Sequence, residues 1–110
     1  REAMAKHHER ALQYAGLTTQ VSVRSAGRVV IFELTADGEN ILDGAMRNGL
    51  DLSYSCKGGV CATCKAKVLE GEVDMDLNHA LAQDELDAGF VLTCQSHPIS
   101  RKVVIDFDAR

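Results

Sequence analysis

The sequence is poor in several features that would define other classes of protein. It has no tryptophan and a single proline in 110 residues. No stretch approaches the roughly 18 consecutive apolar residues of a membrane-spanning helix. No charged, apolar leader with a small-residue cleavage site is present either, so we expect a cytoplasmic protein that does not contact a membrane.

The chain also has fewer positively than negatively charged residues. The chain has 12 Lys and Arg residues against 16 Asp and Glu residues, a formal net charge of −4. Binding to a phosphate backbone requires a clustered basic face, so we expect no nucleic-acid partner. The length suits one domain, which we expect to be monomeric. Because the first residue is Arg1 rather than methionine, we expect a segment excised from a longer chain.

Recognisable catalytic sets are missing as well. We find no Ser/His/Asp arrangement, no paired carboxylates on a recognisable scaffold, and no glycine-rich nucleotide motif that opens a βαβ unit. We therefore predict a domain without a self-contained active site. A flavin or nicotinamide domain, if one exists, lies outside these residues.

The first half of the chain has clear periodicity. Residues 1–17 are predicted to form an amphipathic connector helix, with Met4, Ala11, Leu12 and Ala15 on one face and Gly16 at its end. Alternation from Val21 and a β-rich run over residues 29–34 predict a hairpin that turns at Gly27-Arg28. Asn40 is predicted to cap a short helix that carries Ile41, Leu42, Ala45 and Met46 and ends at Gly49.

The second half is predicted from turns and short apolar runs. Residues 53–64 have neither helical nor strand periodicity, and we predict an ordered loop. Strands follow at 65–69, 91–93 and 103–107, with a one-turn helix at 84–88. The fold class is therefore α+β, with a small mixed sheet.

Four cysteines are what the sequence does contain. Cys56, Cys61 and Cys64 stand in the pattern Cys-x4-Cys-x2-Cys, and Cys94 follows after a predicted strand and helix. This is the plant-type spacing of cysteines that hold a [2Fe-2S] cluster. We predict that all four thiolates ligate such a cluster.

The loop around these cysteines has the composition that such a cluster needs. Thiolates and inorganic sulfides carry negative charge, so backbone N–H groups must come close to them, and close approach requires small residues. Gly58, Gly59, Ala62 and Thr63 meet that requirement. Their amides are expected to favour reduction of the cluster.

Other uses of the same thiols remain open at this point. Zinc bound by Cys61, Cys64, Cys94 and His97 is a plausible set, but it leaves Cys56 without a role. Disulfides are disfavoured in a reducing cytoplasm. A Rieske centre needs two histidine ligands, and no Cys-x-His is present to complete one.

The four histidines give little indication of a functional role. His7 and His8 are expected to be solvated on the connector helix. His79 lies in the acidic segment, and the sequence does not favour a solvated position for it over any other. His97 follows a predicted ligand and precedes the only proline, a position that would allow a supporting role near the metal. An ordinary loop position is the simpler prediction for it.

Two segments resemble a known family, the plant-type [2Fe-2S] ferredoxins. They are ILDGAMRNGLDLSYSCKGGVCATCKAKVLEGEV and VLTCQSHP. Together with VVIDFD, they are similar to the C-terminal ferredoxin domains of phenylacetyl-CoA epoxidase reductases and related multicomponent oxygenase reductases. The resemblance covers about residues 21–108 and implies a β-grasp fold, with Cys56, Cys61, Cys64 and Cys94 as iron ligands.

The resemblance also implies a function. It implies a one-electron carrier that receives electrons from a flavin and NAD(P)H module, in cis or in trans, and passes them to an oxygenase component. Residues 1–19 are then a connector and residues 20–110 the ferredoxin domain of an NAD(P)H-dependent oxidoreductase. FAD and NAD(P)H belong to that upstream module. A free-standing shuttle ferredoxin and a zinc-stabilised interaction module are the alternatives.

Two further features concern partners. Lys57 stands where photosynthetic ferredoxins commonly carry arginine, which keeps the charge but not the forked geometry. Seven acids and no Lys or Arg lie between Val68 and Ser100. They either form a docking face that steers a basic partner or are simply a solvated surface. The acids are Glu70, Glu72, Asp74, Asp76, Asp84, Glu85 and Asp87.

Overall fold

The computed structural model describes residues 2–52, 59 and 63–109. Its larger sheet has five strands in the order β2-β1-β7-β3-β5, and its smaller sheet pairs β4 with β6. The strands are β1 (Thr18–Ser25), β2 (Arg28–Thr35), β3 (Lys65–Glu70), β4 (Val73–Met75), β5 (Phe90–Leu92), β6 (Ser96–Pro98) and β7 (Lys102–Asp106). The helices are α1 (Glu2–Gln13), α2 (Ile41–Arg47) and α3 (Gln83–Asp87), and η1 (Thr93–Gln95) is a 3-10 turn.

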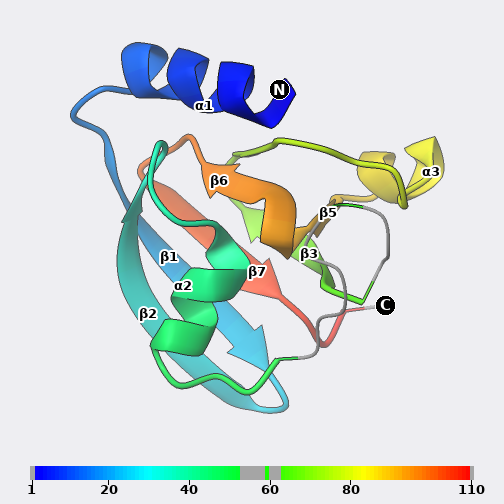
Figure 1. Cartoon of the computed structure of the whole chain (residues 1–110). Helices are drawn as coiled ribbons and strands as arrows, with labels where there is room; N and C mark the ends of the chain where they lie inside the picture. The colour runs from blue at the N-terminus through cyan, green and yellow to red at the C-terminus, as the bar shows by residue number, and fades with distance from the viewer. Residues whose placement is uncertain (1, 53–58, 60–62, 110) are drawn as a thin grey trace.

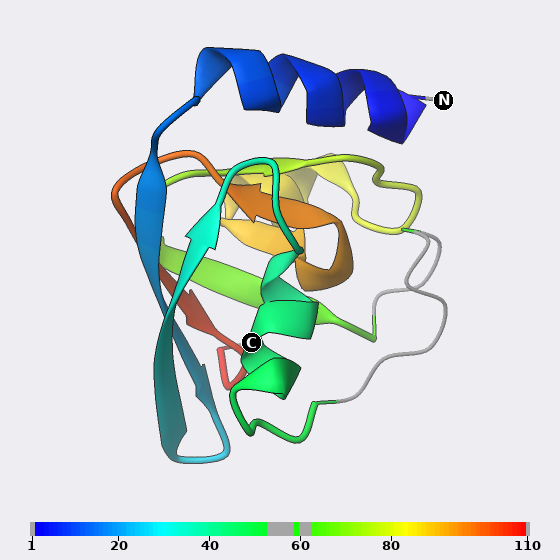
Figure 2. The same cartoon turned by 60° about the vertical axis from the view of Figure 1, so that its left-hand side comes forward.

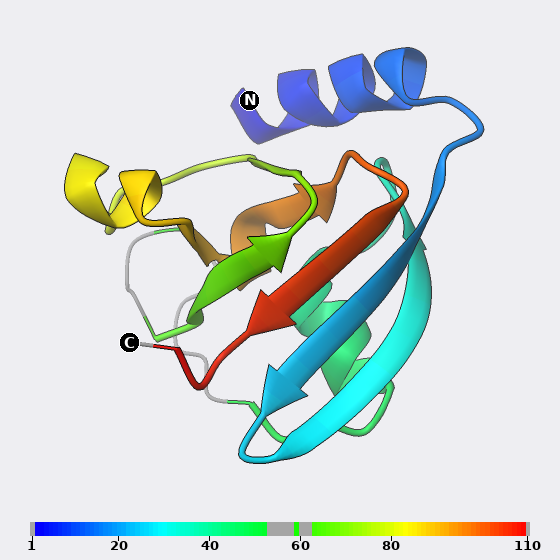
Figure 3. The same ribbon diagram turned by 180° about the vertical axis from the view of Figure 1, so that it is seen from behind.

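The five-stranded sheet is mixed, as predicted. β1 and β7 run parallel, whereas β1–β2, β3–β7 and β3–β5 are antiparallel. The helix α2 crosses one face of this sheet (Figure 2). Its residues Ile41, Leu42 and Ala45 are buried in the core. No described helix lies over the opposite face (Figure 3). The α+β class is therefore confirmed.

The predicted hairpin forms, with its turn one residue earlier than expected. Its two central residues are Ala26 (φ 52°) and Gly27 (φ 76°) rather than Gly27 and Arg28. Positive φ at both central positions is typical of a type I′ turn, whose twist matches that of the two strands. The predicted cap of α2 is also confirmed, because the Asn40 side chain accepts a 2.8 Å hydrogen bond from the Asp43 amide.

The prediction for the first helix is wrong in two respects. The helix ends at Gln13 rather than at residue 17. Its expected apolar face is not the docking face, since Leu12 is 71% exposed and Ala15 is also exposed. The docked side chain is instead Arg10, which is 2% exposed and reaches Asp74 and Asp76 beside the small sheet. Helix α1 lies over that sheet (Figure 1).

No described helix is long and apolar enough to cross a membrane.

Candidate metal centre

Two of the four cysteines lie within the described residues, and the fold brings them together. Cys64 immediately precedes β3, and Cys94 lies in η1 directly after β5. Because β3 and β5 pair antiparallel, with Lys65 opposite Leu92, the ends that carry the cysteines meet. Their Sγ atoms are 3.2 Å apart, and both residues are buried.

A threonine fixes the backbone between the two cysteines. Thr93 is fully buried, and both its amide and its hydroxyl donate to the Cys64 carbonyl, at 3.2 Å and 2.8 Å. The turn that carries Cys94 is thereby attached to the residue that carries the other thiol. Each buried hydrogen bond of this kind contributes about 1 kcal/mol, so the pair of sulfur atoms is held on rigid backbone.

The two thiols influence each other's ionisation. The hydrogen bond between the two thiols lowers the pKa of Cys64 to about 6, although burial acts in the opposite direction. The pKa of Cys94 is raised, first by that same hydrogen bond and then by burial. These opposite shifts favour a state in which the pair shares one proton. Metal binding must displace that proton, because the thiolate is the form that ligates.

Gly59 is the described glycine of the predicted loop, and it does approach the site closely. Its backbone amide hydrogen-bonds to Cys94 and lowers the pKa of that thiol. Its φ is +79°, and a Cβ here would lie 3.1 Å from the carbonyl oxygen of Leu77. The His79 amide donates to the Gly59 carbonyl at 2.7 Å. The expectation of a small residue that donates an amide to sulfur is met at this position.

Gln95 is a site residue that the sequence reasoning missed. Its buried side-chain amide lies 3.7 Å from Cys94 Sγ and lowers the pKa of that thiol. Its backbone carbonyl accepts a 2.8 Å hydrogen bond from the Asp76 amide. Its position next to Cys94 is only weak evidence for a role at the site. A single sequence does not show whether a glutamine side chain points toward the site or into solvent.

The remaining predicted loop residues lie outside the described ones. They are Cys56, Cys61, Gly58 and Ala62. Among residues 2–52, 59 and 63–109, no group of three or more His, Cys, Asp and Glu side chains is placed to hold a metal ion. Three of the four ligands of the alternative zinc site, Cys64, Cys94 and His97, are within that range. The structure does not bring these three side chains together as a metal site.

His97 occupies a different setting from the predicted loop position. It lies in β6 opposite Asp74, is 7% exposed, and its Nε2 is 3.0 Å from a carboxylate oxygen of Asp76. The loop prediction for His97 is therefore wrong. The strand was missed because it has three residues and its partner is 23 positions away in sequence. His7 and His8 are exposed, as expected, and His79 is exposed as well.

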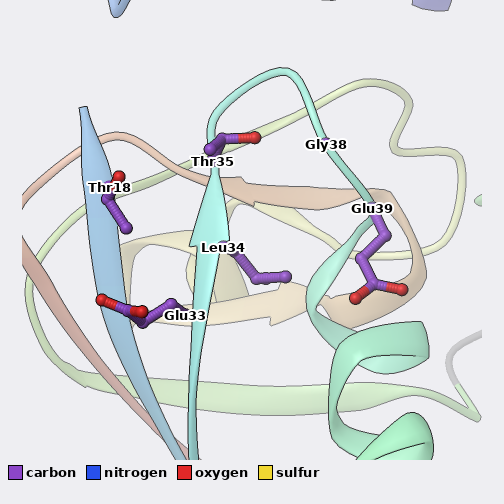
Figure 4. Close-up of a pocket in the computed structure, with 6 residues that line it drawn as sticks. All are labelled: Thr18, Glu33, Leu34, Thr35, Gly38 and Glu39. Carbon is purple, nitrogen blue, oxygen red and sulfur yellow. The ribbon is translucent and has the colours of Figure 1, made fainter. Parts of the chain in front are cut away.

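A separate pocket of about 320 Å³ lies beside the end of β2, away from any cysteine side chain that the structure describes (Figure 4). It offers two carboxylates and two hydroxyls but no thiol. Its lining residues are Thr18, Glu33, Leu34, Thr35, Gly38 and Glu39.

The thiol pair fits an iron–sulfur centre. With metal–sulfur distances of about 2.3 Å, two thiolates on one tetrahedral ion lie about 3.7 Å apart, so a separation of 3.2 Å requires only a small opening. Amide donors from Gly59 and Gln95 are aimed at one of these sulfur atoms. Such donors are the usual means by which a protein stabilises charge on cluster sulfur atoms.

Comparison with known proteins identifies the family. A family model described as a 2Fe-2S iron-sulfur cluster binding domain matches residues 23–98. The chain belongs to this family. Its cofactor is a 2Fe-2S cluster, and its role is that of an electron carrier.

The relatives of this 2Fe-2S domain include components of oxygenase systems. The chain is 57% identical to a subunit of 1,2-phenylacetyl-CoA epoxidase from Escherichia coli (strain K12), over 83% of this chain and 26% of that protein. It is 32% identical to the ferredoxin reductase component of a 3-ketosteroid-9-alpha-monooxygenase from Rhodococcus rhodochrous, over 80% of this chain and 28% of that protein. The chain thus spans about a quarter of each of these relatives.

Solved structures agree on the ferredoxin-type fold. Phthalate dioxygenase reductase, described as a modular structure for electron transfer from pyridine nucleotides to [2Fe-2S], superposes with a TM-score of 0.65 at 26% identity. The match covers 83% of this chain and 27% of that one. The ferredoxin domain of NdmD, solved with NdmA of Pseudomonas putida CBB5, gives 0.66 at 25% identity, with 82% and 99% covered.

Proposed function

We propose that Cys56, Cys61, Cys64 and Cys94 ligate the cluster, and that the domain passes single electrons from a flavin and NAD(P)H module to an oxygenase component. The observation that carries the ligand assignment is the buried pair of Cys64 and Cys94, with sulfur atoms 3.2 Å apart and Gly59 and Gln95 donating to one of them. The plant-type spacing adds the other two thiols.

The protein's part in electron transfer is to stabilise charge. The cluster supplies a centre that accepts one electron, and in formal counting this adds one negative charge. The Gly59 amide and the Gln95 side chain place positive ends of N–H dipoles at Cys94, so they favour the reduced state. Burial of both described thiols keeps water away from that sulfur pair.

The names of the relatives support the choice of donor and acceptor. Several are reductase components of monooxygenases, including phenol and propane monooxygenases. We assign residues 1–19, which include the first two residues of β1, to a connector, and residues 20–110 to the carrier domain, monomeric and cytoplasmic. A free-standing shuttle ferredoxin remains the second candidate, supported by a 41% identity to Ferredoxin-1 of Haloarcula marismortui over 67% of this chain and 58% of that protein.

The ligand assignment is tested by substituting each cysteine singly with serine and measuring bound iron and sulfide after anaerobic reconstitution. Each of Cys56→Ser, Cys61→Ser, Cys64→Ser and Cys94→Ser should lower cluster content or alter its spectrum, whereas Thr63→Ser in the same loop should not. A cysteine variant that retains an unchanged cluster removes that residue from the ligand set.

The donor is tested with the full-length polypeptide that contains this chain. NADH or NADPH should reduce its bound flavin and then bleach the visible bands of the cluster. If the full-length polypeptide begins shortly before Arg1 and binds no flavin, the shuttle ferredoxin is correct. In that case a separate reductase must supply the electrons.

Fewer acids of the acidic segment are available to a docking partner than the sequence indicates. Arg10 forms ion pairs with both Asp74 and Asp76, while Glu70 lies 3.6 Å from Lys102 and Glu85 3.0 Å from Lys65. Of the seven acids of this segment, Glu72, Asp84 and Asp87 are exposed and form no ion pair with another described residue. Two of these three lie on α3, which makes α3 the candidate contact for a basic partner.

Salt dependence tests that contact. If α3 steers a basic acceptor, the rate of electron transfer to it should fall as ionic strength rises, and Asp84→Asn with Asp87→Asn should flatten the dependence. Glu33→Gln, an exposed acid on β2, serves as the control. A rate that is independent of ionic strength identifies the acidic segment as a solvated surface.

A further inference from the structure

Arg10 is the most completely enclosed charge among the described residues, and it lies on a helix outside the matched family model. Its side chain is 3% exposed. Nε donates to the Ala36 carbonyl at 3.0 Å, Nη1 to Asp74 at 2.9 Å and Nη2 to Asp76 at 2.5 Å. The matched family segment starts at residue 23, so α1 lies outside it.

The contacts of Arg10 continue toward the metal centre. Asp76 directly follows β4, and its amide donates to the Gln95 carbonyl at 2.8 Å. The side chain of Gln95 in turn donates to Cys94 Sγ. The path from α1 to a predicted iron ligand therefore consists of three consecutive hydrogen-bonded steps, through Arg10, Asp76 and Gln95.

Neighbouring contacts attach the same segment to the turn that carries Cys94. Strand β4 pairs with β6, with Met75 opposite Ser96, immediately after the turn. Met75 Sδ also accepts from the Leu92 amide at 3.4 Å, immediately before the turn. The β4 segment thus contacts both sides of η1, and Arg10 fixes β4 from the outside.

We propose that Arg10 is a positioning residue for the cluster: by holding Asp74 and Asp76, it sets the hydrogen bond from Gln95 to Cys94 and thereby the reduction potential. This inference rests on the proposed ligand role of Cys94. Arginine suits the task because its planar fork fixes two carboxylates and a carbonyl at once, which lysine cannot reproduce.

Arg10→Lys separates positioning from charge. It keeps the positive charge but loses the fork, so the midpoint potential should fall, in the same direction as in Gln95→Leu. In the Gln95→Leu background, the shift caused by Arg10→Lys should shrink to less than half, because both changes remove the same hydrogen bond. An unchanged potential in Arg10→Lys, or shifts that simply add, overturns the proposal.

The matched control is Arg47→Lys. Arg47 also holds a carboxylate, Glu39, through Nε at 2.7 Å and Nη2 at 2.5 Å, but it is 58% exposed and lies on α2. This variant should leave the potential unchanged. If it shifts the potential as much as Arg10→Lys does, the effect is not specific to the path through Asp76.

Amide hydrogen exchange supplies a readout that does not depend on the cluster. The Asp76 amide should exchange several-fold faster in Arg10→Lys than in the unsubstituted chain, because its acceptor on Gln95 is no longer held in place. Unchanged exchange overturns the proposal whether or not metal is bound. Absence of a cluster from the unsubstituted chain instead contradicts the proposed function, so the two failures are distinguishable.

Discussion

His97 Nε2 and Asp76 Oδ2 lie 3.0 Å apart, and both side chains are largely buried. The other ring nitrogen, Nδ1, is buried and has no hydrogen-bond partner among the described residues. The arrangement suits a neutral ring that donates from Nε2, since a proton on Nδ1 would face no acceptor there. Burial, followed by the charge of Arg10, lowers the pKa of His97, although the carboxylate of Asp76 opposes this; His7 adds a smaller lowering effect.

The stability of the domain should therefore depend on pH through His97. A lowered pKa in the folded state means that the unfolded chain takes up the proton first as the pH falls. Stability is then fully present above about pH 6.5, the ordinary histidine pKa, and is lost as the pH falls from there toward the folded-state pKa. The thermal midpoint of the unsubstituted chain should fall between pH 7.5 and 5.5, and His97→Gln should reduce that fall.

The control for this prediction is His8→Gln, since His8 is exposed on α1. All midpoints should be recorded at one scan rate, because cluster loss can make unfolding irreversible. Equal pH dependence in the unsubstituted chain and His97→Gln would contradict the assigned role of His97.

We expect Gly59 to stabilise the cluster through its amide, in addition to allowing the positive φ of the backbone at this position. Gly59→Ala places a Cβ 3.1 Å from the Leu77 carbonyl and imposes φ +79° on alanine, which costs about 1–2 kcal/mol. The displaced amide would weaken its hydrogen bond to Cys94, so we expect a lower midpoint potential and faster cluster loss. Visible absorption and a redox titration measure both.

Gly27→Ala is the matched control. Gly27 has a similar φ of +76°, but a Cβ there would meet nothing within 4 Å, and the residue lies in the β1–β2 turn. Both variants should unfold at lower temperature. Only Gly59→Ala should change the cluster's spectrum and potential, and a similar change in Gly27→Ala would refute a local role for Gly59.

The β1–β2 turn offers a stabilising substitution. Ala26 has φ 52°, the only positive value at a non-glycine position among the described residues. Type I′ turns favour Asn-Gly, so Ala26→Asn should stabilise the domain by about 0.5–1 kcal/mol, raising the thermal midpoint by a few degrees. Ala88→Asn, at an exposed position with φ −79°, should have little effect. If the thermal midpoint of Ala26→Asn does not rise, the positive φ at Ala26 does not destabilise this turn.

Local patterns predicted much of this fold because local physics determines it. Alternation predicted β1 and a β-rich run predicted β2, and Asn40 was identified as a cap because its side chain satisfies an amide three residues away. Strands β4 and β6 were missed, since Asp74 and His97 stabilise each other's strands only once the chain has folded. The docking of α1 was missed for a similar reason, because Arg10 is buried by carboxylates more than 60 positions away.

The sequence predicted the cysteines of the candidate site but not the residues that support them. Cysteine spacing predicted the four thiols, and the structure brings Cys64 and Cys94 together, while Cys56 and Cys61 lie outside the described residues. The supporting residues Thr93, Gln95 and Asp76 act through backbone and side-chain contacts across distant segments. Such contacts have no signature in a single sequence.

The most direct test of the account is electron paramagnetic resonance of the anaerobically purified chain after reduction with dithionite, with iron, sulfide and zinc measured on the same sample. We predict a brown protein with two irons and two sulfides and a rhombic half-integer-spin signal on reduction. A colourless protein that holds one zinc ion and gives no signal would contradict the account and would favour a zinc-stabilised module instead.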